Sequence, residues 1–171
     1  MSDTKQLNKF QVFLKEYVPY IAIIILVLLI KRFVVSPIKV NGNSMVDTLH
    51  DGDIMLLNVI GYRLSGVERF DIVVCDTDKE YIIKRVIGLP GETIEYRDNQ
   101  LYVNGKKIKE NYGSDVTDDF KVKVPKNSYY VLGDNRTNSL DSRYFGAFSK
   151  KQILGKTKLT LFPFGRIGNK N

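Results

Sequence analysis

Ser44 is the first residue whose surroundings could support chemistry, because it stands in the small polar stretch GNSMVDTL. A serine followed three residues later by an aspartate, here Asp47, also fits a turn or a helix N-cap. A serine nucleophile needs a group that accepts its proton. His50, the only histidine in the chain, follows closely in the same loop, and we expect it to be structural. A lysine is therefore the better candidate for the base.

Lys84 is that candidate, and it lies in the apolar stretch YIIKRVIG, residues 81 to 88. Side chains alternate along a strand, so Ile82, Lys84 and Val86 share one face, and the other face is also largely apolar. Lowering the pKa of a lysine by about 2 to 3 units takes roughly 3 to 4 kcal/mol of differential desolvation, which an apolar strand can supply. Two interpretations stay open, a solvated lysine near a sheet edge and a buried general base.

The composition limits the remaining possibilities. The chain has 171 residues, 43% of them hydrophobic, which suffices for one soluble domain beyond an N-terminal segment. The formal charge of +7 comes from dispersed lysines and arginines, which would suit an anionic membrane surface as well as nucleic acid. Cys75 is the only cysteine, so we expect a buried structural thiol, no internal disulfide, and neither a metal site nor a cofactor.

The N-terminal region contains the uncharged stretch VPYIAIIILVLLI, residues 18 to 30, which resumes as FVV after two basic residues. A helix over residues 18–35 would extend about 27 Å, against roughly 30 Å for the hydrocarbon core of a bilayer. We predict an uncleaved transmembrane anchor, with Pro19 in its first turn. A cleaved signal peptide is the alternative, but residues 34 to 37 offer no small-x-small cleavage pattern. Basic residues flank both ends, so the charges leave the orientation open.

Beyond residue 40 the sequence favours strands, because valine, isoleucine and aromatic residues alternate with turn formers. The predicted strands are DIVVC, 71 to 75; YIIKRVIG, 81 to 88; TIEY and LYV, within 93 to 103; SYYVLG, 128 to 133; and ILGKTKLTLF, 153 to 162. Residues 109 to 120 are predicted as a loop, and GDNRTNSLDSRYFG is too rich in turn formers to be a strand. The predicted fold class is mostly β, with an N-terminal transmembrane helix followed by a β-rich domain.

Four segments, taken in their order and spacing, resemble the type I signal peptidases, the bacterial leader peptidases with a Ser-Lys dyad. The segments are Gly42-x-Ser44-Met45, Asp51-Gly52-Asp53, Lys84 to Gly91, and Gly133-Asp134-Asn135-Arg136 with Ser139 and Asp141-Ser142-Arg143. The resemblance covers nearly the whole chain. The single anchor and the small insertion between the last two segments are most similar to the short form of Gram-positive bacteria.

The resemblance implies a role for each matching residue. Ser44 matches the nucleophile and Lys84 the general base of a dyad that forms and then hydrolyses an acyl-enzyme, with the Ser44 N–H as oxyanion donor. Ser139 matches a serine whose hydroxyl contacts the lysine nitrogen and orients it. Asp141 and Arg143 match a structural ion pair. Supporting roles fall to the remaining matched residues, which are Gly133, Asp134, Asn135 and Arg136.

Three positions depart from the pattern of the family. Asp47 stands where proline is usual, and its carboxylate would favour a protonated Lys84 if the two approached each other. We expect Asp47 to point outward or to cap the turn. Glu92 replaces a frequent aspartate, which is a minor change. Gly42 stands where some relatives have a serine that assists the oxyanion, so a side-chain donor is missing here.

By this resemblance, the chain is expected to be a membrane-bound serine endopeptidase that removes N-terminal signal peptides from exported preproteins. Its substrates would carry small residues at the −1 and −3 positions, as in Ala-x-Ala, and would bind in extended form beside a strand edge. Residues just after Lys84 and around Gly42 would line the small pockets. Residues 1–17 would be cytoplasmic, 18–35 the anchor in the plasma membrane and 36–171 the extracytoplasmic domain. The expected partners are preproteins, the lipid bilayer and the export machinery, but not nucleic acid.

Two other functions stay open at this point. A self-cleaving repressor-type Ser-Lys protease would share the dyad, but it should carry a DNA-binding domain where the anchor lies. A non-enzymatic, membrane-anchored β domain would use Ser44 to cap a turn and would leave Lys84 solvated. A pKa of Lys84 well below the solvated value would favour the enzyme.

Overall fold

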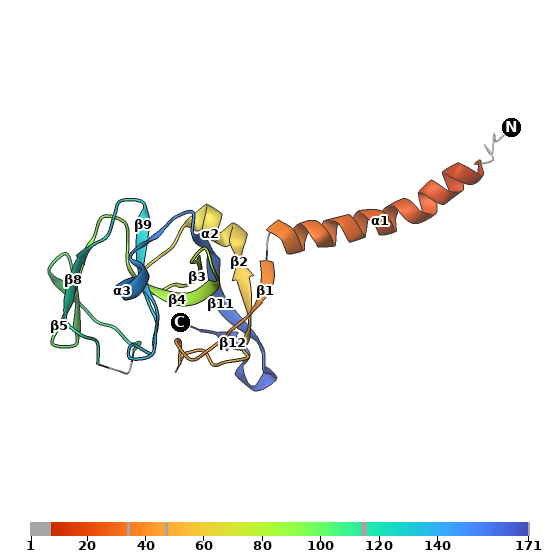
Figure 1. Cartoon of the computed structure of the whole chain (residues 1–171). Helices are drawn as coiled ribbons and strands as arrows, with labels where there is room; N and C mark the ends of the chain where they lie inside the picture. The colour runs from red at the N-terminus through yellow and green to blue at the C-terminus, as the bar shows by residue number, and fades with distance from the viewer. Residues whose placement is uncertain (1–7, 34, 47, 114–115, 171) are drawn as a thin grey trace.

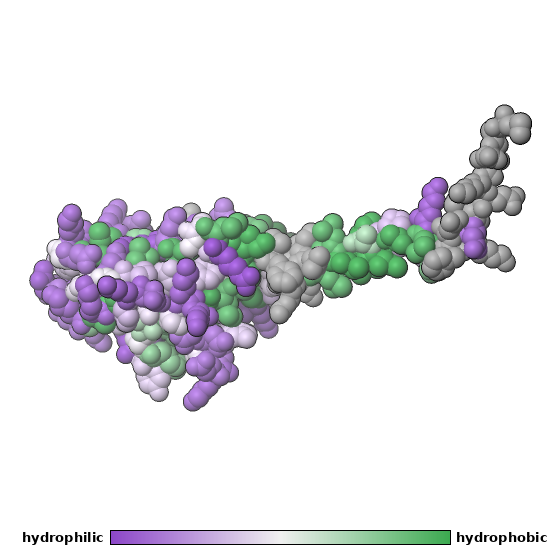
Figure 2. All heavy atoms as spheres, turned by 90° about the horizontal axis from the view of Figure 1, so that it is seen from above, coloured by the Kyte–Doolittle hydropathy of each residue, from purple (hydrophilic) through white to green (hydrophobic). Residues whose placement is uncertain are grey.

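A computed structural model of the protein describes residues 8–33, 35–46, 48–113 and 116–170. Helix α1, Lys9–Phe33, extends away from a β domain (Figure 1). Apolar side chains of its described part, from Phe13 to Leu28, are exposed, and they form the green rod in Figure 2. Among the described residues, no helix combines the length and the apolar character that crossing a membrane requires.

Helix α1 begins earlier than the sequence predicts. Residues 9–17 join the helix, so Pro19 lies in the helix interior and not in its first turn. That part of the prediction is wrong, because residues 9–17 contain no glycine or proline that would prevent the helix from extending toward the N-terminus. At its other end the helix stops at Phe33, and Val35 already starts strand β1.

Two antiparallel sheets form the β domain, which confirms the predicted mostly-β class. The large sheet has the strand order β1-β2-β11-β3-β4-β9-β10, with β12 paired to β11, and the small sheet has the order β7-β6-β5-β8. The strands of the large sheet are β1 Val35–Lys39, β2 Ile54–Asn58, β3 Ile72–Asp76, β4 Tyr81–Gly88, β9 Ser128–Leu132, β10 Phe148–Ser149, β11 Ile153–Phe162 and β12 Gly168–Asn169. Those of the small sheet are β5 Thr93–Arg97, β6 Gln100–Val103, β7 Lys106–Ile108 and β8 Phe120–Lys123. The short helices are α2 Val59–Ser65, α3 Ser142–Phe145 and the 3-10 turn η1 Phe164–Arg166.

Three clusters of buried side chains hold these elements together. One cluster joins the two sheets, because Ile87 and Leu132 of the large sheet pack with Ile94 and Tyr96 of the small one. A second lies on β3, β4 and β9 and contains Cys75, which is fully buried as predicted. Burial raises the pKa of its thiol to about 12, so the thiol is unreactive at neutral pH. The third cluster lies beneath the loop that carries Ser44.

Strand β4 changes its surroundings halfway along. The part from Tyr81 to Arg85 pairs with β3, whereas β9 pairs only with the part from Arg85 to Gly88. Within the described residues, the edge from Tyr81 to Lys84 therefore has no strand partner on the β9 side. Burial follows the same division: Tyr81 is exposed, Ile82 and Ile83 are partly buried, and every residue from Lys84 onward is buried. Lys84 thus stands at the point where an open strand edge enters the core.

Candidate active site

Lys84 and Ser44 meet in the structure, although a long stretch of chain separates them. Lys84 Nζ donates a hydrogen bond to Ser44 Oγ over 2.7 Å and a second one to the carbonyl oxygen of Ile83 over 3.1 Å. Ser44 lies in a turn that begins no helix of the described chain, so the N-cap interpretation is wrong. The geometry brings together the two side chains that the sequence singled out.

Lys84 is buried, with 3% of its surface exposed, so the interpretation as a solvated lysine is wrong. Lys84 takes part in none of the ion pairs found among the described residues. Burial lowers the pKa of Lys84 from its ordinary value of 10.5, and this effect outweighs nearby acidic groups, of which Asp141 has the largest opposing influence. A lysine with a lowered pKa supplies more neutral amine, the form that accepts a proton.

The loop between β1 and β2 carries Ser44, and we call its residues 41–46 and 48–50 the nucleophile loop. Met45 and Leu49 anchor it, because both side chains are almost fully buried in the cluster beneath the loop. Gly42 has a φ of +84°, a conformation that suits glycine, and its N–H donates to Asp51 Oδ1 over 2.8 Å. The Asp-Gly-Asp segment of the sequence therefore helps to shape the loop.

Asn135 ties the nucleophile loop to the segment that follows β9. Its backbone N–H donates to the carbonyl oxygen of Ser44 over 3.0 Å, and its Nδ2 donates to the carbonyl oxygen of Asn43 over 3.1 Å. Thr48, at the other end of the loop, donates its hydroxyl to Asp134 Oδ2 over 2.5 Å. Two consecutive residues, Asp134 and Asn135, thus hold the loop at both sides of the serine.

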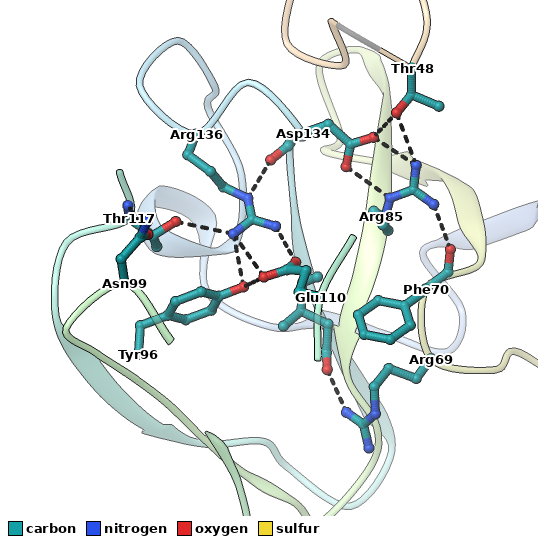
Figure 3. A network of polar contacts seen from close by, with 12 residues as sticks. Thr48, Arg69, Phe70, Arg85, Tyr96, Asn99, Glu110, Thr117, Asp134 and Arg136 are labelled. Carbon is teal, nitrogen blue, oxygen red and sulfur yellow. Dashed lines mark hydrogen bonds and ion pairs between the residues drawn. The ribbon is translucent and has the colours of Figure 1, made fainter. Parts of the chain in front are cut away.

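Asp134 also pairs with Arg85, the residue after the lysine. Arg85 Nε and Nη2 donate to the two carboxylate oxygens over 2.8 and 2.7 Å, and the guanidinium is fully buried (Figure 3). A third bond runs from Arg85 Nη1 to the carbonyl oxygen of Phe70 over 2.9 Å. Strand β4, which carries Lys84, is therefore joined through a bidentate ion pair to the segment that holds the nucleophile loop.

Gly133 lies where these segments come closest. Its N–H donates to Asp141 Oδ2 over 3.0 Å, and its carbonyl oxygen accepts from Arg136 Nε over 2.9 Å. A Cβ on Gly133 would lie 2.2 Å from Ser139 Oγ and 2.5 Å from the carbonyl oxygen of Ser44. Only glycine fits at this position without displacing Ser139 or the backbone of Ser44.

Ser139 differs from its expected role. Its Oγ is buried and makes no hydrogen bond within the described ranges, so the expected contact with the nitrogen of Lys84 is absent. The Asp141–Arg143 pair is present, with Arg143 Nη2 donating to Asp141 Oδ2 over 2.8 Å. Burial raises the pKa of Asp141, but hydrogen bonds from Arg143 and from the Gly133 N–H prevail and leave this pKa below its ordinary value. Asp141 therefore stays ionised and holds Gly133.

A cleft of about 680 Å³ opens beside the dyad, between β1 and the open part of β4. Apolar side chains line much of it, among them Ile38, Leu57, Val74, Ile82, Leu140 and Leu154. Residues around Gly42 line it as expected, but on β4 the lining runs from Tyr81 to Lys84, with Glu80 just before the strand. The expectation that residues just after Lys84 line the pockets is wrong, because β9 covers that part of the strand.

Two further predicted residues lie apart from the dyad or outside the described chain. His50 is not among the residues that line the cleft, and its backbone N–H donates to Asp53 Oδ2 over 3.0 Å. Asp47 lies outside the described residues, so its orientation stays a prediction.

Sequence reasoning missed Glu110, Tyr96 and Thr117, which surround Arg136. Nothing in their local sequence distinguishes them from ordinary residues of a sheet and a loop.

Comparisons with known proteins show which proteins this chain is similar to. The family described as signal peptidase, peptidase S26, matches residues 14–162. A signal peptidase I S from Bacillus subtilis is 44% identical over 162 residues, covering 86% of this chain and 88% of the relative. A signal peptidase IB from Staphylococcus aureus is 39% identical over 176 residues, covering 90% and 92%. The crystal structure of a signal peptidase I from Enterococcus faecalis V583 is 39% identical and covers 53% of this chain and 95% of that one, with a TM-score of 0.49.

Proposed function

This chain belongs to the signal peptidase family, peptidase S26, and we propose that it cleaves signal peptides from preproteins with Ser44 as nucleophile and Lys84 as general base. It is a serine endopeptidase. The Gram-positive resemblance agrees with the relatives from Bacillus and Staphylococcus. The signal peptidase activity is favoured over the repressor-type alternative, because the signal peptidase family matches residues 14–162 and the relatives are signal peptidases.

The dyad transfers one proton in acylation and a second proton in deacylation. Neutral Lys84 Nζ takes the proton of the Ser44 hydroxyl as Oγ attacks the carbonyl carbon of the scissile bond. The protonated amine then gives that proton to the leaving nitrogen, and the peptide bond breaks to leave an ester on Ser44. Lys84 next takes a proton from water, which attacks the ester, and the proton returns to Ser44 Oγ. The Ser44 N–H faces the developing oxyanion, and Gly42 offers no side-chain hydroxyl beside it.

The substrate segment binds in the cleft as an extended strand. The unpaired edge of Tyr81 to Lys84 on β4 offers main-chain groups to it, as does the outer edge of β1, which pairs only with β2 in the described chain. Apolar lining residues and small residues around Gly42 leave room for short side chains near Ser44. A small-x-small site such as Ala-x-Ala, cut after its last residue, fits this arrangement.

The N-terminal helix serves as the membrane anchor in this proposal. The part of α1 that begins at residue 18 crosses the plasma membrane once, with residues 1–17 in the cytoplasm and the β domain, which begins with β1 at Val35, outside. The exposed apolar side chains from Val18 to Leu28 support it, because such a surface needs a nonpolar environment (Figure 2). The bilayer and the export machinery are then the partners that bring preproteins to the cleft. Extraction of membranes with alkaline carbonate tests the anchor: the full chain should stay in the pellet, and release into the supernatant would contradict it.

The 2.7 Å contact between buried Lys84 Nζ and Ser44 Oγ carries the proposal. The test is cleavage of a purified preprotein with an Ala-x-Ala site, in detergent micelles, with the new N-terminus read by mass spectrometry. Wild type should cut after the Ala-x-Ala site, and Ser44→Ala and Lys84→Met should both lose at least about a thousandfold in rate.

Matched controls are Ser65→Ala and Lys123→Met, because both residues are exposed and neither lines the cleft. They should cleave at the wild-type rate. Cleavage that survives Lys84→Met would remove the lysine from the mechanism. A folded wild type that cuts none of several preproteins would contradict the proposed activity.

A further inference from the structure

We propose that Glu110, which lies between β7 and β8 of the small sheet, is a positioning residue of the peptidase that acts on the nucleophile loop through Arg136. The inference rests on the proposed function and extends it to the small sheet, which lies on the side of the domain away from α1 (Figure 1). Glu110 itself does not line the cleft. Its influence must therefore pass through other side chains.

Arg136 is the first link, and it is almost completely enclosed. The Arg136 side chain is 1% exposed and that of Glu110 12%. Arg136 Nη2 donates to Glu110 Oε1, and Nη1 donates to Tyr96 Oη over 2.8 Å and to Thr117 Oγ1 over 3.1 Å (Figure 3). Three side chains thus surround one buried cation, and Glu110 supplies the only negative charge in direct contact with it among the described residues.

Tyr96 and Gly113 fix the geometry of this pair. Tyr96 Oη donates to Glu110 Oε2 over 2.6 Å, and burial keeps the phenol protonated by raising its pKa well above the ordinary value. A Cβ on Gly113 would lie 2.8 Å from the Cζ of Arg136, so the backbone after Glu110 packs directly on the guanidinium. The carboxylate of Glu110 is therefore held in one orientation.

The second link runs from Arg136 to the serine. Arg136 Nε donates to the carbonyl oxygen of Gly133, and Gly133 lies so close to the carbonyl oxygen of Ser44 that a Cβ would come within 2.5 Å. Arg143 Nη2 donates to the carbonyl oxygen of Arg136 over 2.7 Å and so fixes the backbone on the other side of the guanidinium. A shift of Arg136 toward the small sheet moves Gly133, and with it the peptide groups that face Ser44.

The same stretch of chain also covers the arginine beside the base. The ring of Tyr112 stacks on the guanidinium of Arg85, with the Cζ of Arg85 3.6 Å from the ring centroid. Residues 110–113 therefore touch both buried arginines, one linked to the nucleophile loop through Gly133 and one through Asp134 and Thr48. Two independent contacts from one segment favour a positioning role over a purely local one.

The test compares Glu110→Gln and Glu110→Asp with the control Glu95→Gln in the full chain in detergent micelles. Glu95 is on β5 of the same sheet, and it pairs with the exposed Lys121 rather than with Arg136. The first readout is hydrogen exchange of two backbone amides. The Asn135 N–H donates to the carbonyl oxygen of Ser44, and the Leu49 N–H donates to the carbonyl oxygen of Met45. The second is kcat and KM for a preprotein.

Glu110→Gln should speed exchange at both amides and lower kcat about tenfold, with KM changed less than about twofold. Glu110→Asp keeps the charge and should lie between Glu110→Gln and wild type; it also replaces Glu110→Gln if the latter does not fold. Glu95→Gln should match wild type. The proposal is overturned if Glu110→Gln leaves both amides and kcat unchanged, if it speeds exchange only in β5 and β6, or if Glu95→Gln acts as strongly. A wild type that cuts no preprotein would contradict the proposed function, while the exchange rates would still test the positioning.

Discussion

Asn135 orients the peptide group that contains the N–H of Ser44, because its Nδ2 donates to the carbonyl oxygen of Asn43 over 3.1 Å. That carbonyl and the Ser44 N–H belong to the same planar peptide group. The backbone N–H of Asn135 holds the next peptide group by donating to the carbonyl oxygen of Ser44. One residue of the segment after β9 thus fixes the direction of the proposed oxyanion donor.

Asn135→Ala should therefore lower kcat more than it raises KM. The variant keeps the backbone bond to Ser44 but frees the peptide group whose N–H meets the oxyanion. Misdirecting one oxyanion donor should lower kcat by roughly 10- to 100-fold. Steady-state kinetics on a preprotein measures the effect, with the exposed Asn127→Ala as control. Equal losses in the two variants, or a loss confined to KM, would refute this role.

Gly133→Ala should abolish most of the activity. The added methyl would overlap Ser139 Oγ and the carbonyl oxygen of Ser44, so one of these groups must move. Such overpacking typically destabilises the folded protein by about 1 to 3 kcal/mol. A displacement of Ser44 should lower kcat/KM by about 100-fold or more. Gly165→Ala is the matched control, because a Cβ there meets nothing within 4 Å. Wild-type turnover by Gly133→Ala would show that the close approach does not constrain the serine.

Lys84→Met should be inactive but more stable than wild type near neutral pH. The folded protein with a lowered Lys84 pKa binds fewer protons than the unfolded chain, so the stability of wild type rises with pH up to the unfolded pKa of about 10.4. Each pKa unit of lowering corresponds to about 1.4 kcal/mol of stability lost at neutral pH. Methionine fills the same space without titrating. Urea unfolding of both forms between pH 7 and 10 should show a difference in the free energy of unfolding that narrows as pH rises. A constant difference would mean that the titration of Lys84 does not affect stability.

Glu80→Gln should shift the acid limb of the pH–rate profile to lower pH. The proposed mechanism requires neutral Lys84, so the rate should fall as the pH drops through the pKa of Lys84. Burial is the main cause of the lowered pKa, and Glu80, at the rim of the cleft, is one of the acidic groups that raise it again. Removing that charge lowers the pKa further. The measurement is the pH profile of kcat/KM for Glu80→Gln, with Asp78→Asn as the control, because Asp78 is an exposed aspartate on the same turn. The profile of Asp78→Asn should match that of wild type. A shift of the Glu80→Gln profile toward higher pH would contradict this prediction.

The sequence singled out Ser44 and Lys84, which the structure brings into contact, and it predicted the strands that carry long apolar runs. Ser44 and Lys84 could be selected because a lysine in an apolar strand is unusual and because ordered motifs surround both residues. Strands β3, β4, β9 and β11 were predicted for the same reason, since their alternation or continuous apolar character exceeds that of neighbouring loops. The resemblance supplied the pairing of these distant segments, which local patterns do not contain.

The rest depended on tertiary contacts. Strand β1 contains Pro37 and β8 alternates lysine with apolar residues, so neither stood out as a strand before its partner was known. Helix α2 begins where Asn58 Oδ1 accepts from the Gly61 N–H, a cap that one asparagine among many does not reveal. The network around Arg136 joins residues from β5, the loop before β8 and the loop after β9, and no local spacing predicts such a meeting.

The open edge of β4 has a consequence for timing. The edge lines a cleft, and in the proposed binding mode one extended chain pairs with it, so the residues on both sides of the scissile bond must still lack structure of their own when they arrive. Cleavage therefore competes with the folding of the cargo. An exported protein that folds quickly right up to its cleavage site would keep that site from reaching the open edge of β4. Slow folders and passengers with a short unstructured spacer would be processed first.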